Sequence, residues 1–280
     1  NQLFVVDWEN DGERIQNFTD EKGKLRSRPQ NKEYYFKESI TWSLIGLTFG
    51  PRYTPLGSLF DVGGSSAFPS KDEELWVTGL LCAKQVFRFM KVMNPTLNFQ
   101  VGNVAALPVL RQQVEHFKPD IESVVKALIE STNIDWDAYE RSWDFQSLPL
   151  LTASSDPPPT LESSYTAWIT QNRETIAEMK RLEEENNRLF IDAYGLADEL
   201  NPEVPIEQIT LTVNPAYRYG GKLSEEALWC RFHEDSMAEV VSYAIGCMMG
   251  RYSLDAPGLI YAHSGNEDFD STKYTTYPAD

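Results

Sequence analysis

The chain has 280 residues, of which 41% are hydrophobic and 12% aromatic. This length and composition can build one large domain or two small ones with a proper core, and they exclude a disordered chain. The formal net charge of −17 disfavours nucleic-acid binding by the chain as a whole. Residues 1–110, however, hold 12 Lys and Arg against 12 Asp and Glu, so the acidic excess falls on residues 111–280. If DNA is contacted, the first part is favoured.

No stretch approaches the ~20 consecutive apolar residues that cross a bilayer, and the chain does not open on a signal peptide. We therefore expect no membrane association. Three cysteines, an odd number without metal-ligand spacing, indicate reduced thiols in a cytoplasmic protein: Cys82, Cys230 and Cys247. The chain starts without Met inside an apparent strand, Leu3–Val6, so we expect it to be part of a longer protein.

One basic cluster lies in the first part, around a turn and a proline-containing loop: Lys22, Lys24, Arg26, Arg28 and Lys32. Its functional interpretation is contact with DNA phosphates. The alternative is a solvated charged loop, which composition alone favours.

The next segments predict a small sheet. Residues 39–45 are rich in β-branched and aromatic side chains and predict a strand, followed by a loop over 49–57 and a strand over 58–62. Residues 63–66, Gly-Gly-Ser-Ser, lack the Lys of a P-loop and predict a tight turn. A helix over 80–93 and a strand over 96–101 complete this part.

The second part is predicted to be mainly helical. A helix covers 111–131 with a kink at Pro119, and the aromatic and acidic run 135–145 predicts a packing cluster. After a linker over 154–159, a helix over 161–200 has a coiled-coil-like apolar seam with one Asn, which suggests a hairpin with a helix over 237–249. Residues 206–213 predict a strand, and Ser224 is a helix N-cap.

Four sequence elements resemble one family. They are the helix, Asn-Phe-Gln-Val-Gly strand and Leu-Pro exit of residues 80–110, the run ITWSLI to SSAFP of residues 40–69, the WDAYERSWDF element and the SYAIGCMMGRYSLDAPGLIYA element. The chain is similar to the PglX-type adenine-specific DNA methyltransferases of the BREX phage-defence system, and its layout resembles the target-recognition domains of type I and type IIG enzymes. The resemblance implies that residues 40–69 belong to the sheet of a recognition domain and to its face turned toward DNA. It also implies that the complete enzyme uses S-adenosylmethionine.

Asn214-Pro215-Ala216-Tyr217 resembles the Asn/Asp-Pro-Pro-Tyr/Phe motif with which adenine methyltransferases hold a flipped base. The second proline is absent, and no Gly-rich cofactor loop precedes the motif. In the family a similar element follows the true catalytic motif. We therefore expect no catalytic and no cofactor-binding residues in this chain, and no metal site, because three histidines lack ligand spacing: His116, His233 and His263.

The sequence thus predicts an α+β protein, with a recognition-type α/β domain and twisted, mostly antiparallel sheet over 1–110, a helical connector over 111–155 and a helical domain over 156–280. The expected function is recognition of double-stranded DNA within an adenine-N6 methyltransferase, alongside other phage-defence subunits, and the chain should be inactive alone. Candidate DNA contacts are Lys22, Lys24, Arg26 and Arg28 on phosphates, with Arg52 and Tyr53 on base edges or backbone. The alternative is an acidic helical scaffold that docks partner subunits without touching DNA.

Overall fold

The computed structural model describes residues 5–220, 223–263, 265 and 267–279, and it forms two compact units. Unit 1 comprises residues 1–122 with 190–198, and unit 2 comprises 123–189 with 199–280. Helices predominate over one small antiparallel sheet, so the α+β class is confirmed. The division at residues 110 and 155 stays a prediction. Among the described residues, no helix is both long and apolar enough for a bilayer crossing.

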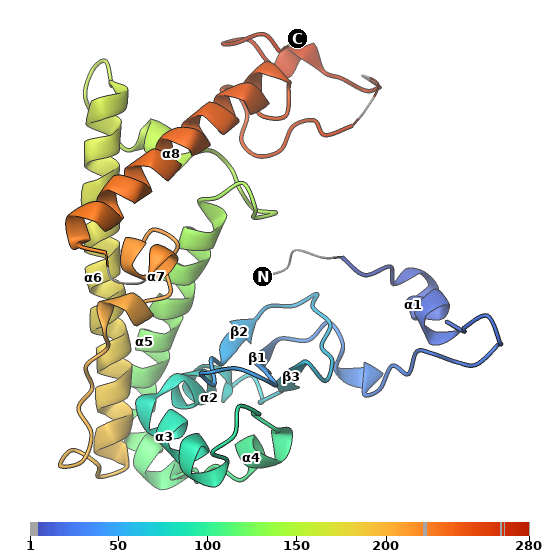
Figure 1. Cartoon of the computed structure of the whole chain (residues 1–280), viewed down its shortest axis with the longest axis vertical. Helices are drawn as coiled ribbons and strands as arrows, with labels where there is room; N and C mark the ends of the chain where they lie inside the picture. Colours follow the sequence, from blue (N-terminus) through green and yellow to red (C-terminus); the bar gives the residue numbers. More distant parts are fainter. Residues whose placement is uncertain (1–4, 221–222, 264, 266, 280) are drawn as a thin grey trace. The chain divides into compact units, whose positions relative to one another are not determined.

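The sheet of unit 1 has three antiparallel strands, with β1 (Ser39–Ser43) between β2 (Arg52–Thr54) and β3 (Gly64–Ala67) (Figure 1). The strand predicted from residue 39 is confirmed. Ile40 and Trp42, two residues apart on one face of β1, are buried, and the Trp42 indole Nε1 donates a hydrogen bond to the carbonyl of Phe99 at 2.8 Å. This bond ties the sheet to a segment 57 residues further along the chain.

Other predicted strands of unit 1 are wrong. Residues 58–62 form no strand, whereas β2 lies in the predicted loop and β3 begins within the predicted Gly-Gly-Ser-Ser turn. The Asp61 carboxylate accepts hydrogen bonds from the backbone of Gly63 and Gly64, so the turn comes just before β3. In the segment 96–101 only Asn98 makes a bridge, to Ile45, and the chain then enters α4 (Val101–Ala105).

The two helices predicted from residues 80 and 111 are present with changed bounds, whereas α1 (Glu9–Gln16) and α4 were not predicted. Residues 80–93 are helical but divided between α2 (Glu74–Cys82) and α3 (Lys84–Met93), because Ala83 is extended with ψ 147°. The helix α5 (Arg111–Asp137) continues past Pro119 and ends later than predicted. At the start, Leu3 and Phe4 lie outside the described residues, and Val5 and Val6 are exposed and not in a strand. The first helix is α1 (Glu9–Gln16), followed by a 3-10 turn, Lys32–Tyr34.

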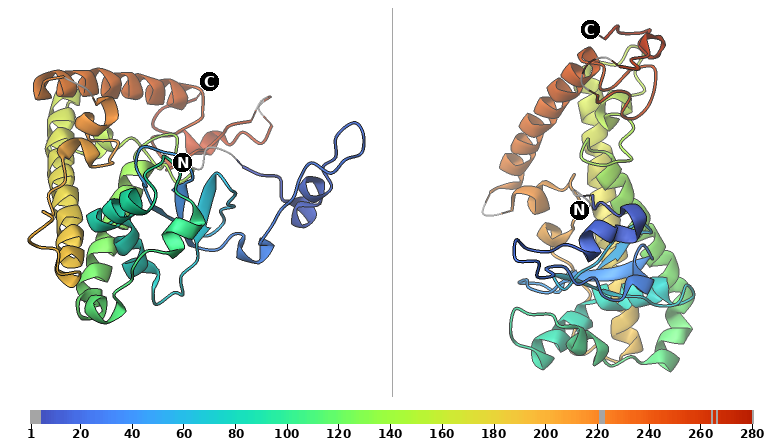
Figure 2. Two further views of the ribbon diagram at one scale, coloured as in Figure 1. Left: turned by 60° about the horizontal axis from the view of Figure 1, so that its bottom comes forward. Right: turned by 90° about the vertical axis from the view of Figure 1, so that its right-hand side faces the viewer.

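Unit 2 is built around two helices, α6 (Leu161–Ala193) and α8 (Glu225–Met248), with the short α7 (Pro215–Tyr219) between them in sequence. The long helix is confirmed, and Figure 2 shows α6 as one unbroken helix. It ends seven residues earlier than predicted, shortly before Gly195 (φ +64°). The Ser224 hydroxyl accepts a hydrogen bond from the Ala227 backbone, which confirms the predicted N-cap of α8. Three 3-10 turns complete the unit: Pro149–Thr152, Ile206–Gln208 and Ser271–Lys273.

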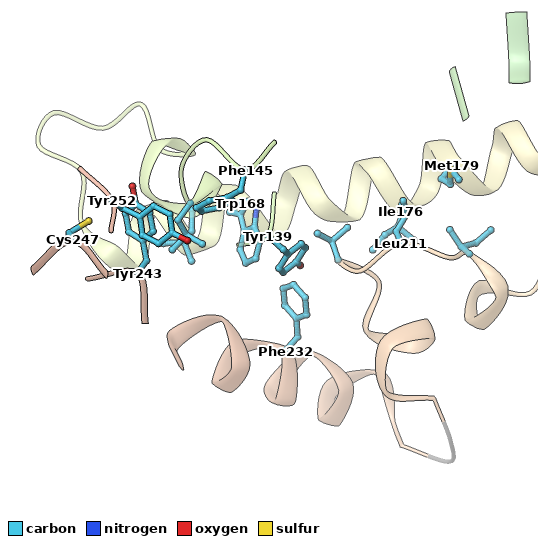
Figure 3. Close-up of a cluster of buried hydrophobic side chains, with 14 of the residues drawn as sticks. Tyr139, Phe145, Trp168, Ile176, Met179, Leu211, Phe232, Tyr243, Cys247 and Tyr252 are labelled. Carbon is cyan, nitrogen blue, oxygen red and sulfur yellow. The ribbon is translucent and has the colours of Figure 1, made fainter. Parts of the chain in front are cut away.

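The core of unit 2 is rich in aromatic rings (Figure 3). Trp168 of α6 stacks on Phe232 of α8 with ring centres 5.4 Å apart, and Tyr243 stacks on Tyr252 at 5.1 Å. The ring stacking between α6 and α8 thus uses the first half of α8, whereas the predicted hairpin placed the pairing at 237–249. Stacked and edge-to-face rings each add about 1 kcal/mol beyond the area they bury.

Two predictions in unit 2 need correction. Residues 206–213 form no strand, although Ile209, Leu211 and Val213 alternate into the core as the pattern indicates. Their backbone is held by Asp135, whose carboxylate accepts hydrogen bonds from Thr212 and Val213 at 2.7 and 3.0 Å. In the aromatic run 135–145, Tyr139 does pack in the core, but Trp143 is 74% exposed because the helix ends at Asp137.

Candidate nucleic-acid interface

The predicted basic loop is the tip and return strand of a hairpin in unit 1. The Arg26 backbone donates a hydrogen bond to the carbonyl of Phe18 at 2.8 Å, and the Asp20 backbone donates to the carbonyl of Lys24 at 2.9 Å. Gly23, with φ +73°, closes the turn in a conformation that favours glycine. We call residues 18–28 the basic hairpin.

The carboxylate of Asp20 holds the turn of this hairpin through three hydrogen bonds. Asp20 Oδ1 accepts hydrogen bonds from the backbone of Lys22 and Lys24 at 3.0 and 2.9 Å, and Oδ2 accepts one from the Arg26 guanidinium at 2.8 Å. The acid adjacent to the basic cluster therefore shapes the turn and pairs with only one of its cations. The Arg26 pair is partly exposed, so its net contribution to stability is small.

The other cations of the hairpin are available to a ligand. Lys22, Lys24 and Arg28 are exposed, and none of them makes an ion pair within the described part of the chain. Residues 22–32 contain five Lys and Arg and no Asp or Glu. Lys32 donates a hydrogen bond to the Gln16 side chain at 2.8 Å. Four of the five cations of the predicted cluster thus lie on the basic hairpin, and Lys32 lies in the 3-10 turn that follows it.

The strand pairing also sorts side chains by face. Directly opposite residues of an antiparallel pair lie on the same face, so Phe18 shares a face with Arg26 and with the next hydrogen-bonded pair, Asp20 and Lys24. Leu25 lies on the other face, opposite Thr19. Phe18 is 61% exposed. Sequence reasoning missed this aromatic residue, because only the backbone pairing places it opposite Arg26.

Aromatic contacts hold the segment that precedes and follows the hairpin. The Trp8 ring meets Tyr35 and Phe36 edge-on at 5.3 and 5.6 Å, and Tyr35 meets Phe60 at 5.3 Å. A Cβ atom at Gly12 would lie 2.8 Å from the Trp8 ring, and Gly12 has φ +76°. Only glycine permits this close approach without strain.

Arg52 and Tyr53 are placed on the edge strand β2. Arg52 is exposed and donates a hydrogen bond to the Ser43 hydroxyl at 3.0 Å. The Tyr53 hydroxyl donates to Glu38 at 2.7 Å, and Lys71 bonds the same carboxylate at 2.6 Å. Burial and the hydrogen bond to Glu38 raise the pKa of Tyr53. In the described part of unit 1, no hydrogen bond or ion pair joins these residues to the basic hairpin.

In the Asn214–Tyr217 motif, the Asn214 side chain has a structural role. Asn214 is 1% exposed, and its amide nitrogen donates hydrogen bonds to the carbonyls of Ile206 and Ile209 at 2.8 and 2.9 Å. Its amide oxygen accepts from the Ala216 backbone at 3.1 Å and caps α7. Both ends of the Asn214 amide are thus engaged within the fold, and its oxygen, the acceptor that an adenine amino group would need, is the cap of α7. Among the described residues, no group of His, Cys, Asp and Glu side chains could hold a metal ion.

These features define a mixed helical and sheet protein whose cationic hairpin suits a polyanion. No family model matches the sequence. The chain is 35% identical over 282 residues to the adenine-specific methyltransferase PglX of Lacticaseibacillus casei (strain Zhang). This match covers 99% of the chain and 22% of PglX. The chain is 33% identical over 288 residues to the adenine-specific methyltransferase BrxX of Escherichia coli O9:H4 (strain HS), covering 100% of the chain and 22% of that protein.

The resemblance to PglX-type adenine-specific methyltransferases is thereby confirmed along the whole chain. The chain spans about a fifth of the length of these curated relatives.

Proposed function

We propose that this chain supplies DNA target recognition within a site-specific adenine-N6 DNA methyltransferase of a phage-defence system. The observation that carries the proposal is the basic hairpin, where Lys22, Lys24 and Arg28 are exposed and form no ion pair with any described residue, and where the Phe18 ring is exposed as well. The similarity to adenine-specific methyltransferases supports DNA as the polyanion. Transfer of the methyl group from S-adenosylmethionine belongs to other parts of such an enzyme.

The charge distribution supports contact through unit 1. This unit carries 14 Lys and Arg against 17 Asp and Glu, whereas unit 2 carries 11 against 25, a net charge of −14. Phosphate contacts by the hairpin would fix the orientation of the protein on the duplex. They would also add affinity, because each neutralised phosphate releases a counterion. Arg52 on β2 has donors suited to guanine in the major groove. The tied hydroxyl of Tyr53 favours a supporting role for that residue.

A second candidate function is a protein scaffold, and the strongly acidic unit 2 favours it. On that hypothesis unit 2 docks basic surfaces of partner subunits, and the hairpin contacts no DNA. The two functions predict different behaviour of the hairpin cations toward duplex DNA.

The test is titration of labelled duplex DNA with the chain at several salt concentrations, read by fluorescence anisotropy. Lys24→Ala with Arg28→Ala, which removes two exposed cations and leaves the Asp20–Arg26 pair intact, should weaken binding equally for different DNA sequences and reduce the slope of log affinity against log salt by about 2. The matched control is Lys126→Ala with Arg181→Ala, which removes two exposed cations of unit 2. An unchanged slope in the hairpin variant would contradict phosphate contact.

A further inference from the structure

The second half of α8 and its C-cap residue, Met249, present an apolar stripe to the surface. Four side chains at helical spacing are between 49% and 70% exposed: Val241, Ile245, Met248 and Met249. The opposite face of the same helix is buried through Tyr243 and Cys247, which belong to the core of unit 2. Both faces of this half-helix are therefore apolar, which is typical of a helix covered on two sides.

The surroundings make this stripe unusual. Residues 240–250 contain no charged residue, although they lie in a unit with a net charge of −14. Single exposed apolar side chains are common, but a contiguous stripe on a charged protein marks a site of interaction.

Size and charge restrict the partner. Four half-exposed side chains offer on the order of 400 Å² to a partner, which gives a total below the ~1,200 Å² of stable complexes between separate proteins. Two copies of unit 2 would also bring two acidic surfaces together. A contact of this size suits two parts of one polypeptide, because the connecting chain raises their effective concentration into the millimolar range.

The length of the relatives supplies such a partner. The chain aligns end to end with 22% of the length of PglX and of BrxX, so most of each protein lies outside the matched part. We propose that the stripe Val241–Ile245–Met248–Met249 docks onto the remaining part of a PglX-type methyltransferase. This proposal rests on the proposed function. The docking fixes the target-recognition segment within the enzyme.

Methionine oxidation tests this contact directly, because the thioethers of Met248 and Met249 form half of the stripe. The two proteins to compare are the chain alone and a hybrid of the L. casei PglX in which these 280 residues replace the matching segment. Brief peroxide treatment followed by peptide mass spectrometry reports sulfoxide formation. We expect Met248 and Met249 to oxidise at least fivefold more slowly in the hybrid, and Met93 of α3, which is exposed in unit 1, to oxidise equally in both.

Two variants make the test specific. In the hybrid, Ile245→Asp should restore rapid oxidation, whereas Ile134→Asp, at an exposed position of α5, should not. A misfolded hybrid could leave the methionines unprotected for a trivial reason. A second format therefore adds the remaining part of PglX to the chain as a separate polypeptide, at increasing concentration. Absence of protection in both formats overturns the proposal. Protection in the chain alone, with a dimer seen by sedimentation, also overturns it, because a second copy is then the occupant.

The outcome is independent of DNA binding. Protected methionines with no DNA affinity would retain the docking contact and refute the recognition function, whereas DNA binding with unprotected methionines would do the reverse.

Discussion

At the scale of single residues, Asn214 separates a structural role from a catalytic one. Its amide makes three hydrogen bonds, two to carbonyls of the preceding loop and one as the cap of α7. Tyr217, in the same motif, is 48% exposed. In a methyltransferase motif both side chains would contact the base. Here the Asn214 side chain is hydrogen-bonded within the fold, and the Tyr217 side chain is half exposed.

We predict that Asn214→Ala lowers the free energy of unfolding by about 2–4 kcal/mol, because buried carbonyls lose their donors and α7 loses its cap. Tyr217→Ala should change it by less than ~0.5 kcal/mol, as exposed substitutions usually do. Urea unfolding followed by circular dichroism measures both. Equal stabilities of Asn214→Ala and the unmodified chain would refute the structural assignment.

Glu183 of α6 gives the fold a dependence on pH. Burial, with a smaller contribution from Glu184, raises the pKa of Glu183 from 4.5 to about 7. The folded chain therefore binds this proton more tightly than the unfolded chain does. Its contribution to stability is complete below pH ~4.5 and is lost as the pH rises toward 7.

Replacing Glu183 with Gln should remove that loss. We expect Glu183→Gln to stabilise the chain at pH 8 by on the order of 2 kcal/mol, with a difference that shrinks as the pH falls to 5. Glu174→Gln, at an exposed position of the same helix, is the control, and urea unfolding at each pH measures both variants. A stability difference that does not vary with pH would show that Glu183 ionises normally.

At the scale of elements, α8 depends on a glycine at its contact with the chain that follows it. A Cβ atom at Gly246 would lie 2.7 Å from the Tyr252 ring, which stacks on Tyr243. Tyr252 also meets Phe145 edge-on at 5.5 Å, so the ring is held from two sides. Glycine within a helix costs about 1 kcal/mol relative to alanine, and this close contact explains why it is nevertheless present.

Gly246→Ala should therefore destabilise the chain by about 1–3 kcal/mol, although alanine is the better helix former. The measurement is the melting temperature by calorimetry. Combining Gly246→Ala with Tyr252→Leu should remove the clash, and the two substitutions should then cost less than the sum of their separate effects. Strict additivity would indicate that the tyrosine ring is not the obstacle.

The sequence predicted the helices better than the strands, for a physical reason. Apolar spacing within one segment determines a helix, so the long helices from residues 111 and 161 were found. A strand requires a partner that is distant in sequence. Gly64–Ala67 has little intrinsic preference for a strand and becomes one by pairing with β1, whereas the alternating residues 206–213 lack a partner strand.

The candidate interface shows the same limit. Its cations were visible in the composition, but two features were not. The position of Phe18 beside Arg26 depends on pairing across the hairpin, and the use of Asp20 as an internal brace depends on the turn geometry. Whether the hairpin contacts DNA stays a prediction.

At the scale of the whole molecule, charge sets the conditions for DNA binding. A chain with net charge −17 gains affinity for DNA only where cations are concentrated, and the proposed function assigns one phosphate to each of the four hairpin cations, with the Asp20–Arg26 pair opening for the fourth. We therefore expect affinity for duplex DNA to fall on the order of 10²-fold between 50 and 200 mM salt. Salt-independent DNA binding would place the contact away from the basic hairpin.

Isothermal titration with S-adenosylmethionine should give no heat of binding.

The chain passes between its two units three times, because residues 190–198 at the end of α6 belong to unit 1. In that short return, Tyr194 donates a hydrogen bond to the carbonyl of Pro108 at 2.7 Å and lies 6.1 Å from the ring of Phe89. Genetic exchange of residues 1–122 between relatives would therefore separate these partners. On the proposed function, a recognition specificity acquired by recombination would have to bring a compatible Tyr194 segment with it, whereas point substitutions in the hairpin would not.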